Sequence, residues 1–351
     1  MRVVVVGATG NVGTSLLEAL ADEPQVESVL GLARRSPQLA PAKAEWAQAD
    51  IACDELLPYL RDADCVVHLA WQIQPSRDLN RLWLTNAHGS ARVFRAAAEG
   101  GVRAIVYASS VGAYSPGPKD RRVDESWPIH GVPTSYYARH KAEVERLLDA
   151  FEREWPEIRV VRLRPGLVFK REAASGIRRL FAGPFLPSPL VRPGLVRFVP
   201  DVPGLRFQAV HSLDVGDSFR RAVVSDVRGA FNIAAEPVLD PPKLARLLGA
   251  RRIEIPVRAA RAVAAATWRL RLQPTPPGWL DLALGVPLLD TAKAREELGW
   301  TPTRDAGEAL LELLGGLRDS AGALTPPLDP RTGGPMRIGE VASGVGARDV
   351  P

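Results

Sequence analysis

Sulfur-containing side chains are rare in this chain of 351 residues, which has two cysteines and two methionines. Cys53 and Cys65 are too few for a disulfide framework or a cysteine-based zinc site, and their scarcity suits a reducing compartment. The five histidines show no metal-ligand spacing. We therefore expect no metal and a cytoplasmic location.

Long apolar runs are also missing. No stretch approaches the roughly 20 residues that a membrane-spanning helix needs. The apolar run at the start of the chain, Val3–Val6, is too short for the core of a signal peptide. With 46% hydrophobic and 24% charged residues, the composition is ordinary for a soluble globular protein. The length suffices for one large α/β domain with a smaller lobe.

Lysine is the scarce cation. The chain has six lysines, so its net charge of +5 comes mostly from arginine. We expect no nucleic-acid partner, because no aromatic platform or known binding module accompanies these arginines. The segment Val257–Leu272 could form an amphipathic helix with a basic face. A solvated face is the favoured interpretation, and contact with a membrane surface is the weaker alternative.

What the chain does have is a glycine-rich turn at its start. Arg2–Val6 is dominated by valine, as is typical of a strand buried on both faces. Gly7, Gly10 and Gly13 follow at once, and Thr14–Leu20 then has the apolar spacing of a helix. Glycine permits a tight turn and lets backbone N–H groups approach a pyrophosphate, whose charge the helix N-terminus favours. This order of strand, glycines and helix predicts a dinucleotide site.

A tyrosine–lysine pair about 130 residues later points to proton chemistry. Tyr137 and Lys141 are four residues apart, so they share one face of a helix. A tyrosine pKa of about 10 leaves about one phenol in a thousand ionised at pH 7, and a nearby ammonium favours the phenolate. Tyr136 is the competing candidate, but its partner four residues on is His140. The pair predicts a tyrosine that acts as general acid or base.

Together and in this order, the two motifs resemble the extended branch of the short-chain dehydrogenase/reductases, the NAD-dependent epimerase/dehydratase group. The resemblance runs from Met1 to about Leu314 and includes a closing signature over 289–302. It implies an α/β fold, a doubly wound parallel (Rossmann) sheet with a smaller C-terminal substrate-binding lobe. The cofactor contacts that it implies are Gly7, Thr9, Gly10, Asn11, Val12, Gly13, Asp50, Ile51, Leu69, Ala70, Asn86, Ala108, Tyr137, Lys141, Pro165 and Gly166.

The same resemblance points to a catalytic hydroxyl. Val106–Ser110 resembles the strand that delivers the family's serine, which implies Ser110, with Ser109 as the alternative. A hydroxyl both donates and accepts, so it can hold a substrate oxygen while a tyrosine moves the proton. We predict that Ser110, Tyr137 and Lys141 are the catalytic residues, with Lys141 also holding the ribose.

The end of the second predicted strand bears on the choice of cofactor. In the NAD-binding pattern an acidic residue ends this strand and takes the ribose hydroxyl. Here Glu27–Ala33 is followed by Arg34 and Arg35, two guanidiniums placed where a 2′-phosphate would lie. We predict that NADP(H) is preferred to NAD(H). The alternative is that Arg34 stacks on the adenine and either cofactor binds.

Composition and the resemblance together divide the chain. We expect residues 1–165 to form the NAD(P)-binding core, with added strands returning near 207–234. Residues 166–206 and 235–314 would form the substrate-binding lobe. Residues 315–351 hold few large apolar side chains and are predicted to be a disordered tail. The resemblance also implies a homodimer.

Departures from the family pattern narrow the reaction. Leu205–Asp214 keeps a histidine and an aspartate but lacks the Arg-Asp pair of nucleotide-sugar members, and the lobe is apolar. Val111 and Gly112 stand where the dehydratases place acidic residues. We predict an oxidoreductase that transfers a hydride between the cofactor and a carbonyl or secondary alcohol of a small molecule.

Two other functions stay open. The first is a nucleotide-sugar epimerase with retained NAD, in which Arg197 or Arg206 would clamp a diphosphate. The second is a dinucleotide sensor without turnover, which is less favoured because a sensor needs no proton-transfer residues. Trp71 and Ser110 complete the candidate substrate contacts.

Overall fold

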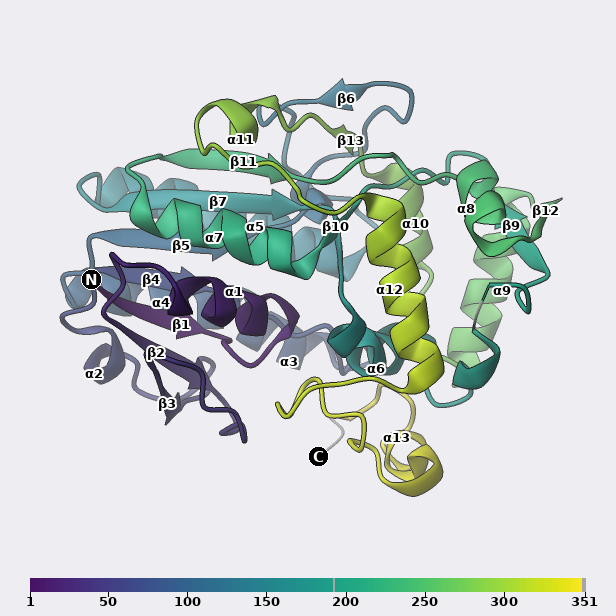
Figure 1. Ribbon diagram of the computed structural model, residues 1–351, viewed down its shortest axis with the longest axis horizontal. Coiled ribbons are helices and arrows are strands. Elements are labelled where there is room, and N and C mark those ends of the chain that lie inside the picture. The colour runs from purple at the N-terminus through teal and green to yellow at the C-terminus, as the bar shows by residue number, and fades with distance from the viewer. Residues whose placement is uncertain (192, 349–351) are drawn as a thin grey trace.

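A parallel β-sheet lies at the centre of the computed structural model, which describes residues 1–191 and 193–348 (Figure 1). Within these residues, seven strands form the sheet in the order β11-β7-β5-β4-β1-β2-β3. They are β1 (Arg2–Val6), β2 (Ser28–Ala33), β3 (Ala44–Gln48), β4 (Cys65–His68), β5 (Ala104–Ala108), β7 (Arg159–Pro165) and β11 (Gly229–Ile233). The order runs outward from β1 in both directions, which is the doubly wound arrangement that the sequence predicts.

Helices cover both faces of this sheet. On one face lie α1 (Asn11–Ala21) and α7 (Ser212–Val224), and on the other lie α4 (Gly89–Glu99) and α5 (Tyr136–Glu154). The central strands are therefore apolar on both sides, and all four residues of β4 are buried. The carboxyl ends of the strands meet at one edge, where a doubly wound sheet binds its ligands.

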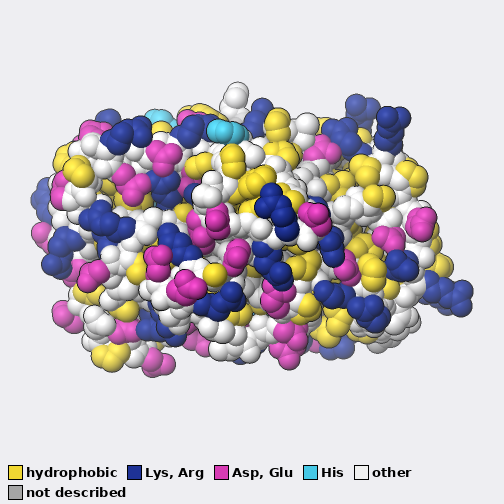
Figure 2. Space-filling model, turned by 90° about the horizontal axis from the view of Figure 1, so that it is seen from above, with side chains coloured by type: hydrophobic (Ala, Val, Ile, Leu, Met, Phe, Trp, Pro, Cys, Tyr) yellow, Lys and Arg dark blue, Asp and Glu magenta, His cyan; other side chains and the backbone are white. Residues whose placement is uncertain are grey.

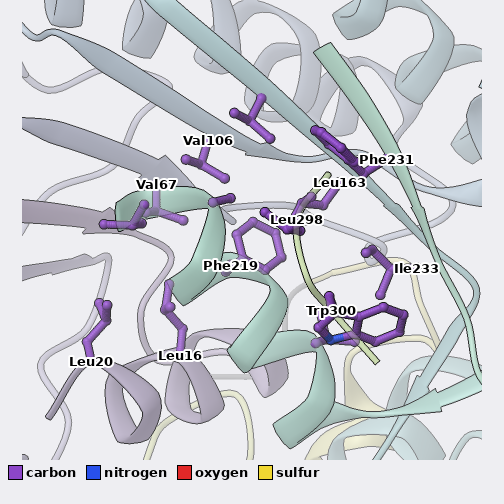
Figure 3. Close-up of a cluster of buried hydrophobic side chains, with 14 of the residues drawn as sticks. Leu16, Leu20, Val67, Val106, Leu163, Phe219, Phe231, Ile233, Leu298 and Trp300 are labelled. Atoms are coloured by element: carbon purple, nitrogen blue, oxygen red, sulfur yellow. The ribbon is translucent and has the colours of Figure 1, made fainter. Parts of the chain in front are cut away.

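One core cluster ties the C-terminal part of the chain to the N-terminal part (Figure 3). Leu16 and Leu20 of α1, Phe219 of α7 and Trp300 belong to it. The indole nitrogen of Trp300 donates to the carbonyl of Asp214 at 2.8 Å. Since burying a large apolar side chain contributes roughly 1.5–3 kcal/mol, the closing signature around Trp300 helps to hold the sheet and its helices together.

The remaining strands form three small two-stranded sheets: β8 pairs with β10, β9 with β12, and β6 with β13. Their bounds and those of the other helices are α2 (Leu57–Leu60), α3 (Leu79–Trp83), β6 (Arg122–Val123), β8 (Leu167–Phe169), α6 (Ala174–Ile177), β9 (Phe198–Asp201), β10 (Ala209–His211), α8 (Pro241–Leu248), β12 (Arg251–Glu254), α9 (Val257–Arg269), α10 (Gly278–Gly285), β13 (Leu288–Leu289), α11 (Ala292–Glu296), α12 (Ala306–Asp319) and α13 (Ile338–Ala342).

The sequence predicts two added strands near 207–234, and the structure differs at the first of them. β11 extends the sheet beside β7, as predicted. β10 instead pairs with β8 outside the main sheet. Gly166 separates β7 from β8, and a Cβ at Gly166 would lie 2.5 Å from the carbonyl oxygen of Gln208. This close approach lets the β8–β10 pair form beyond the end of β7.

The predicted disordered tail is a second difference. α12 continues to Asp319, and the described residues beyond it pack against the rest of the protein. Thr325, Leu328 and Glu340 are buried there. Their anchors are an ion pair and hydrogen bonds to main-chain carbonyls, which the polar composition of this segment does not reveal.

The surface is mixed in charge. The face in Figure 2 carries Lys and Arg side chains interspersed with Asp and Glu. The basic helix predicted at Val257–Leu272 corresponds to α9, in which no residue is buried. Among the described residues, no helix is both long and apolar enough to cross a membrane.

Candidate cofactor and catalytic site

The glycine turn connects β1 to α1 with no room for side chains. Gly7 has φ +89°, and a Cβ there would lie 2.5 Å from the amide nitrogen of Ala70. A Cβ at Gly13 would lie 2.5 Å from the carbonyl oxygen of Ala8. Gly10 caps α1 and has no side chain, so no side-chain acceptor takes the first N–H groups of the helix. This helix N-terminus therefore fits a phosphate group.

A cavity of about 170 Å³ opens beside this turn at the carboxyl edge of the sheet. Its walls combine predicted cofactor contacts with two prolines from the C-terminal part of the chain. The residues that line it include Gly7, Thr9, Gly10, Arg34, Arg35, Asp50, Ile51, Leu69, Ala70, Trp71, Gln72, Pro326 and Pro327. These residues fit the adenosine end of a dinucleotide.

Arg34 is held at the rim of this cavity by a buried glutamine. With its amide oxygen turned toward Arg34, Gln72 accepts from both terminal nitrogens of the guanidinium, at 2.5 and 3.0 Å. In the same orientation its amide nitrogen donates to the hydroxyl of Thr85 at 3.0 Å. This orientation satisfies the amide at both ends. It fixes a cation directly after β2, where the NAD pattern places an acid.

Tyr137 lies in the first turn of α5, beneath the end of β5. Ser135 caps this helix, and its hydroxyl accepts from the amide of Ala138 at 3.3 Å. The Tyr137 ring packs so closely on Gly112 that a Cβ there would lie 2.8 Å from the ring carbon Cε1. Burial raises the pKa of Tyr137 to about 12, and the neighbouring hydroxyl of Ser110 opposes this shift.

Lys141 lies one turn further along α5 and is fully surrounded by protein. Its ammonium donates to the carbonyl of Ala108 at 2.6 Å and lies 3.5 Å from the ring centroid of Trp71. The same ammonium lies 6.0 Å from the ring centroid of Tyr137. Burial lowers the pKa of Lys141 well below its usual value, and the carboxylate of Glu145 opposes the shift. Trp71 therefore stabilises the charged form of a buried lysine.

The two serines at the end of β5 have different partners. The Ser110 hydroxyl accepts from the amide of Gly112 at 3.0 Å, and the Tyr137 ring packs on the same glycine. Ser109 points the other way and donates to Glu145 at 2.5 Å. Of the two serines, only Ser110 lies beside the Tyr137 ring.

Some predicted contacts have structural partners instead of facing a cavity. The side chain of Asn86 is buried and makes two hydrogen bonds to the main chain of Gln72, at 2.7 and 2.8 Å. The side-chain nitrogen of Asn11 donates to the carbonyl of Val168 at 3.1 Å, whereas its oxygen is buried without a partner. Pro165 ends β7 and Gly166 follows it, and neither residue lines the two cavities described here. Asn86 thus braces the loop that carries Trp71.

A larger cavity of about 430 Å³ adjoins the first and shares Arg34, Arg35, Trp71, Gln72 and Pro327 with it. Its other walls come from the loop after β4, from residues 179–184 with Pro274, and from the C-terminal part of the chain. They include Ile73, Gln74, Arg179, Leu180, Gly183, Pro184, Pro274, Thr332, Glu340, Ser343, Val345, Gly346 and Arg348. The cavity is therefore enclosed by three separate parts of the sequence.

The structure does not bring the predicted diphosphate clamps to either cavity. Arg197 is exposed in the loop before β9, and Arg206 donates to the carbonyl of Lys119 at 2.7 Å. Arg179 lines the larger cavity instead. No pattern in the sequence singles out Arg179 or Gln72 as lining a cavity, although Gln72 follows the recognisable end of β4 closely.

Known proteins resemble this chain over different lengths. A model of the NAD dependent epimerase/dehydratase family matches residues 3–179. An uncharacterized protein of Mycobacterium tuberculosis is 29% identical over 313 residues, which cover 88% of this chain. The match spans only 29% of the length of that relative. A putative dihydroflavonol 4-reductase of Synechocystis is 27% identical over 155 residues, 42% of this chain and 44% of the relative.

Solved structures share the fold. The UDP-glucose 4-epimerase of Thermus thermophilus, in complex with NAD, matches with a TM-score of 0.67. The match has 20% identity and covers 91% of this chain and 99% of that one. The residues matched by the family model include the glycine turn, Ser110, Tyr137 and Lys141. The chain belongs to the NAD-dependent epimerase/dehydratase family.

Proposed function

We propose that this protein is an NAD(P)-dependent oxidoreductase acting on a carbonyl or secondary alcohol. The observation that carries the proposal is that Ser110 and Tyr137 meet at Gly112, one helical turn from the buried side chain of Lys141. A Cβ at Gly112 would lie 2.8 Å from Tyr137 Cε1 and 3.4 Å from Ser110 Oγ. These groups lie at the carboxyl edge of the sheet, on the same edge as the phosphate-binding turn. Proton transfer and dinucleotide binding would therefore occur side by side.

Each of the three residues has a separate role. When bound, the nicotinamide ring supplies or takes the hydride. The Ser110 hydroxyl holds the substrate oxygen. Tyr137, with a pKa of about 12, is protonated at neutral pH and donates its proton to that oxygen as a carbonyl is reduced. Lys141 places a positive charge near the phenol and so favours the phenolate that remains.

The surroundings of Tyr137 favour an apolar substrate. The ring of Trp279 lies 4.9 Å from that of Tyr137, and the ring of Trp71 lies 5.9 Å from it. Phe181 packs edge-on against Trp279 at 4.9 Å. A sugar would leave most of its hydroxyl groups without partners against these rings, at a cost of about 1–3 kcal/mol for each buried unpaired group. An aromatic or aliphatic carbonyl compound would not.

Arg34 and Arg35 support NADP(H) as the preferred cofactor. Both line the cavity beside the glycine turn, and Gln72 orients Arg34 there. A guanidinium binds a phosphate through paired, charged hydrogen bonds. Its hydrogen bond to a neutral ribose hydroxyl is much weaker. We expect NADPH to bind more tightly than NADH.

Replacing Tyr137 with Phe tests the catalytic role. The variant keeps the ring and its packing but loses the proton, so turnover of an aromatic or aliphatic ketone with NADPH should be abolished. NADPH binding, measured by fluorescence titration, should stay close to that of the wild type. Loss of NADPH binding, or retained turnover, would remove Tyr137 from the mechanism.

A nucleotide-sugar epimerase is the second candidate. It is supported by the structural likeness to the T. thermophilus UDP-glucose 4-epimerase, which binds NAD. An epimerase that reduces and reoxidises one cofactor within a turnover would keep it bound through purification. Acid-quenching the purified protein and identifying the released nucleotide by mass separates the two. Near-stoichiometric NAD(H) or NADP(H) favours the epimerase, and an empty protein that binds NADPH favours the reductase.

A further inference from the structure

The C-terminal segment, defined here as residues 320–348, crosses the edge of the sheet where ligands bind. It leaves α12 at Ser320, which has a left-handed φ of +51° and turns the chain sharply. In Figure 1 the segment is yellow, runs beside α6 and includes α13. It therefore connects two sides of the ligand site. We call the side near the loop after β2 the sheet side, and the side formed by residues 178–188 the lobe side.

On the lobe side, a buried ion pair holds the segment. Both terminal nitrogens of Arg178 donate to the carboxylate of Glu340, one of them at 2.8 Å. The two side chains are only 5% and 3% exposed. Arg337 adds three hydrogen bonds, to the carbonyls of Pro184 and Leu186 at 2.8 and 2.7 Å and to the hydroxyl of Ser188 at 2.8 Å. A charge pair so well enclosed fixes the segment in one position.

On the sheet side, main-chain contacts hold the segment. The carbonyl of Leu324 accepts from the amide of Gln38, in the loop that follows Arg34 and Arg35, at 3.2 Å. From the lobe side, the side chain of Arg179, the neighbour of Arg178, donates to the carbonyl of Pro327. These contacts place Pro326 and Pro327 across the cavity beside the glycine turn.

The segment contributes the outer wall of both cavities. Pro326 and Pro327 line the smaller one together with Gly7, Gly10 and Asp50. The larger one is lined by Thr332, Glu340, Ser343, Val345, Gly346 and Arg348 of the segment. A ligand in the smaller cavity is thus covered by residues that the Arg178–Glu340 pair helps to hold in place.

We propose that the C-terminal segment is a strap that encloses the bound dinucleotide, with the Arg178–Glu340 pair as its latch. Glu340 acts as a positioning residue, because it contacts Arg178 and holds the wall that covers the cofactor. Release of the dinucleotide requires the latch to open, and cofactor exchange is therefore slow. This inference rests on the proposed function only in requiring that a nicotinamide dinucleotide binds.

The test is the dissociation rate of NADPH from the full-length protein, followed by fluorescence after mixing with excess NADP⁺. In Glu340→Gln, Arg178 loses its counter-charge while the shape of the side chain is kept. Breaking a buried pair is costly, so we expect dissociation to become about tenfold faster or more. The matched control is Glu236→Gln, which removes an exposed ion pair with Arg122 and should leave the rate unchanged.

A second variant keeps the test decisive if Glu340→Gln folds poorly. Arg337→Ala removes three hydrogen bonds of the strap without leaving a buried charge unpaired, and it should speed dissociation in the same direction. A parallel series with NADH gives the same comparison if NADH is the tighter ligand. Equal dissociation rates in the wild type and both variants would overturn the strap. Because no turnover is measured, this outcome is independent of whether Tyr137 transfers a proton.

Discussion

Two buried glutamates, Glu145 and Glu340, form ion pairs with buried arginines in different parts of the molecule. Glu145 is fully buried on α5 and accepts from Arg162 at 3.0 Å and from Arg164 at 2.8 and 3.0 Å. Glu340 accepts from Arg178 and is nearly as enclosed. The first joins α5 to β7 inside the sheet core, whereas the second joins the C-terminal segment to Arg178, which follows α6. The difference is in what each pair holds together.

The contribution of a buried ion pair to stability depends on the elements that it joins. Around Glu145, apolar side chains of α5 and the strands pack on both sides, so the carboxylate is part of a cooperative core. The C-terminal segment has few such side chains and depends on its polar anchors. Loss of the first pair should weaken the whole fold, and loss of the second should free one segment.

The largest effect is expected for Glu145→Gln. Removing this carboxylate leaves Arg162 and Arg164 buried with less counter-charge, which should lower the free energy of unfolding by about 3–5 kcal/mol. Urea denaturation measures it. The control is Glu143→Gln on the same helix, where the exposed pair with Arg146 should contribute less than about 1 kcal/mol. Similar losses of unfolding free energy in the two variants would mean that the buried cluster contributes no more to stability than an exposed ion pair.

The next effect is that of low pH, which should destabilise the core. Burial lowers the pKa of His68 to about 3, whereas an unfolded histidine titrates near 6.5. Below about pH 6.5, His68 therefore binds a proton in the unfolded state but not in the folded state. The free energy of unfolding falls as the pH drops toward 3. The full loss is on the order of 5 kcal/mol. Glu145, with its pKa lowered to about 2, adds a further loss below about pH 4.5.

Replacing His68 with Gln isolates this contribution. The amide can keep the hydrogen bond to the Ser90 hydroxyl, which His68 makes at 2.8 Å, but it does not titrate. The variant should lose much less stability than the wild type between pH 7 and pH 5 in urea denaturation. The exposed His88→Gln is the control and should keep the wild-type pH dependence. Identical curves for all three proteins would show that His68 does not set the acid sensitivity.

The same contrast explains what the sequence could predict. β1, the glycine turn and the Tyr137–Lys141 pair follow from local spacing, because a strand, a tight turn and a helix face each leave a regular pattern. The partners of Arg178 and Arg179 lie about 150 residues away and leave no such pattern. The predicted disorder was wrong for residues 315–348 for that reason, and residues 349–351 lie outside the described residues. Composition indicates how much apolar surface a segment can bury. It does not predict which distant arginine will form an ion pair with a carboxylate of the segment.

Glu340→Gln should have a small global effect and a large local one. We expect the free energy of unfolding to fall by less than about 1 kcal/mol, because the segment opens without the core. Trypsin should then cut the C-terminal segment, at Arg331, Arg337 or Arg348, several-fold faster than in the wild type. Mass spectrometry of the early fragments measures this. If the free energy of unfolding fell as much as in Glu145→Gln, the segment and the core would instead unfold as one cooperative unit.

The smallest effect is expected at Arg34, where the two regions meet. Arg34 and Pro327 line both cavities, so this arginine contacts the cofactor site of the core beneath the strap. If Arg34 binds a 2′-phosphate, Arg34→Ala should weaken NADPH binding by about tenfold and barely change NADH binding, because only NADPH carries that group. If Arg34 stacks on the adenine instead, both cofactors should weaken equally. Titrating both cofactors against this variant and the exposed Arg95→Ala decides between the two, since Arg95 lies on α4 away from both cavities.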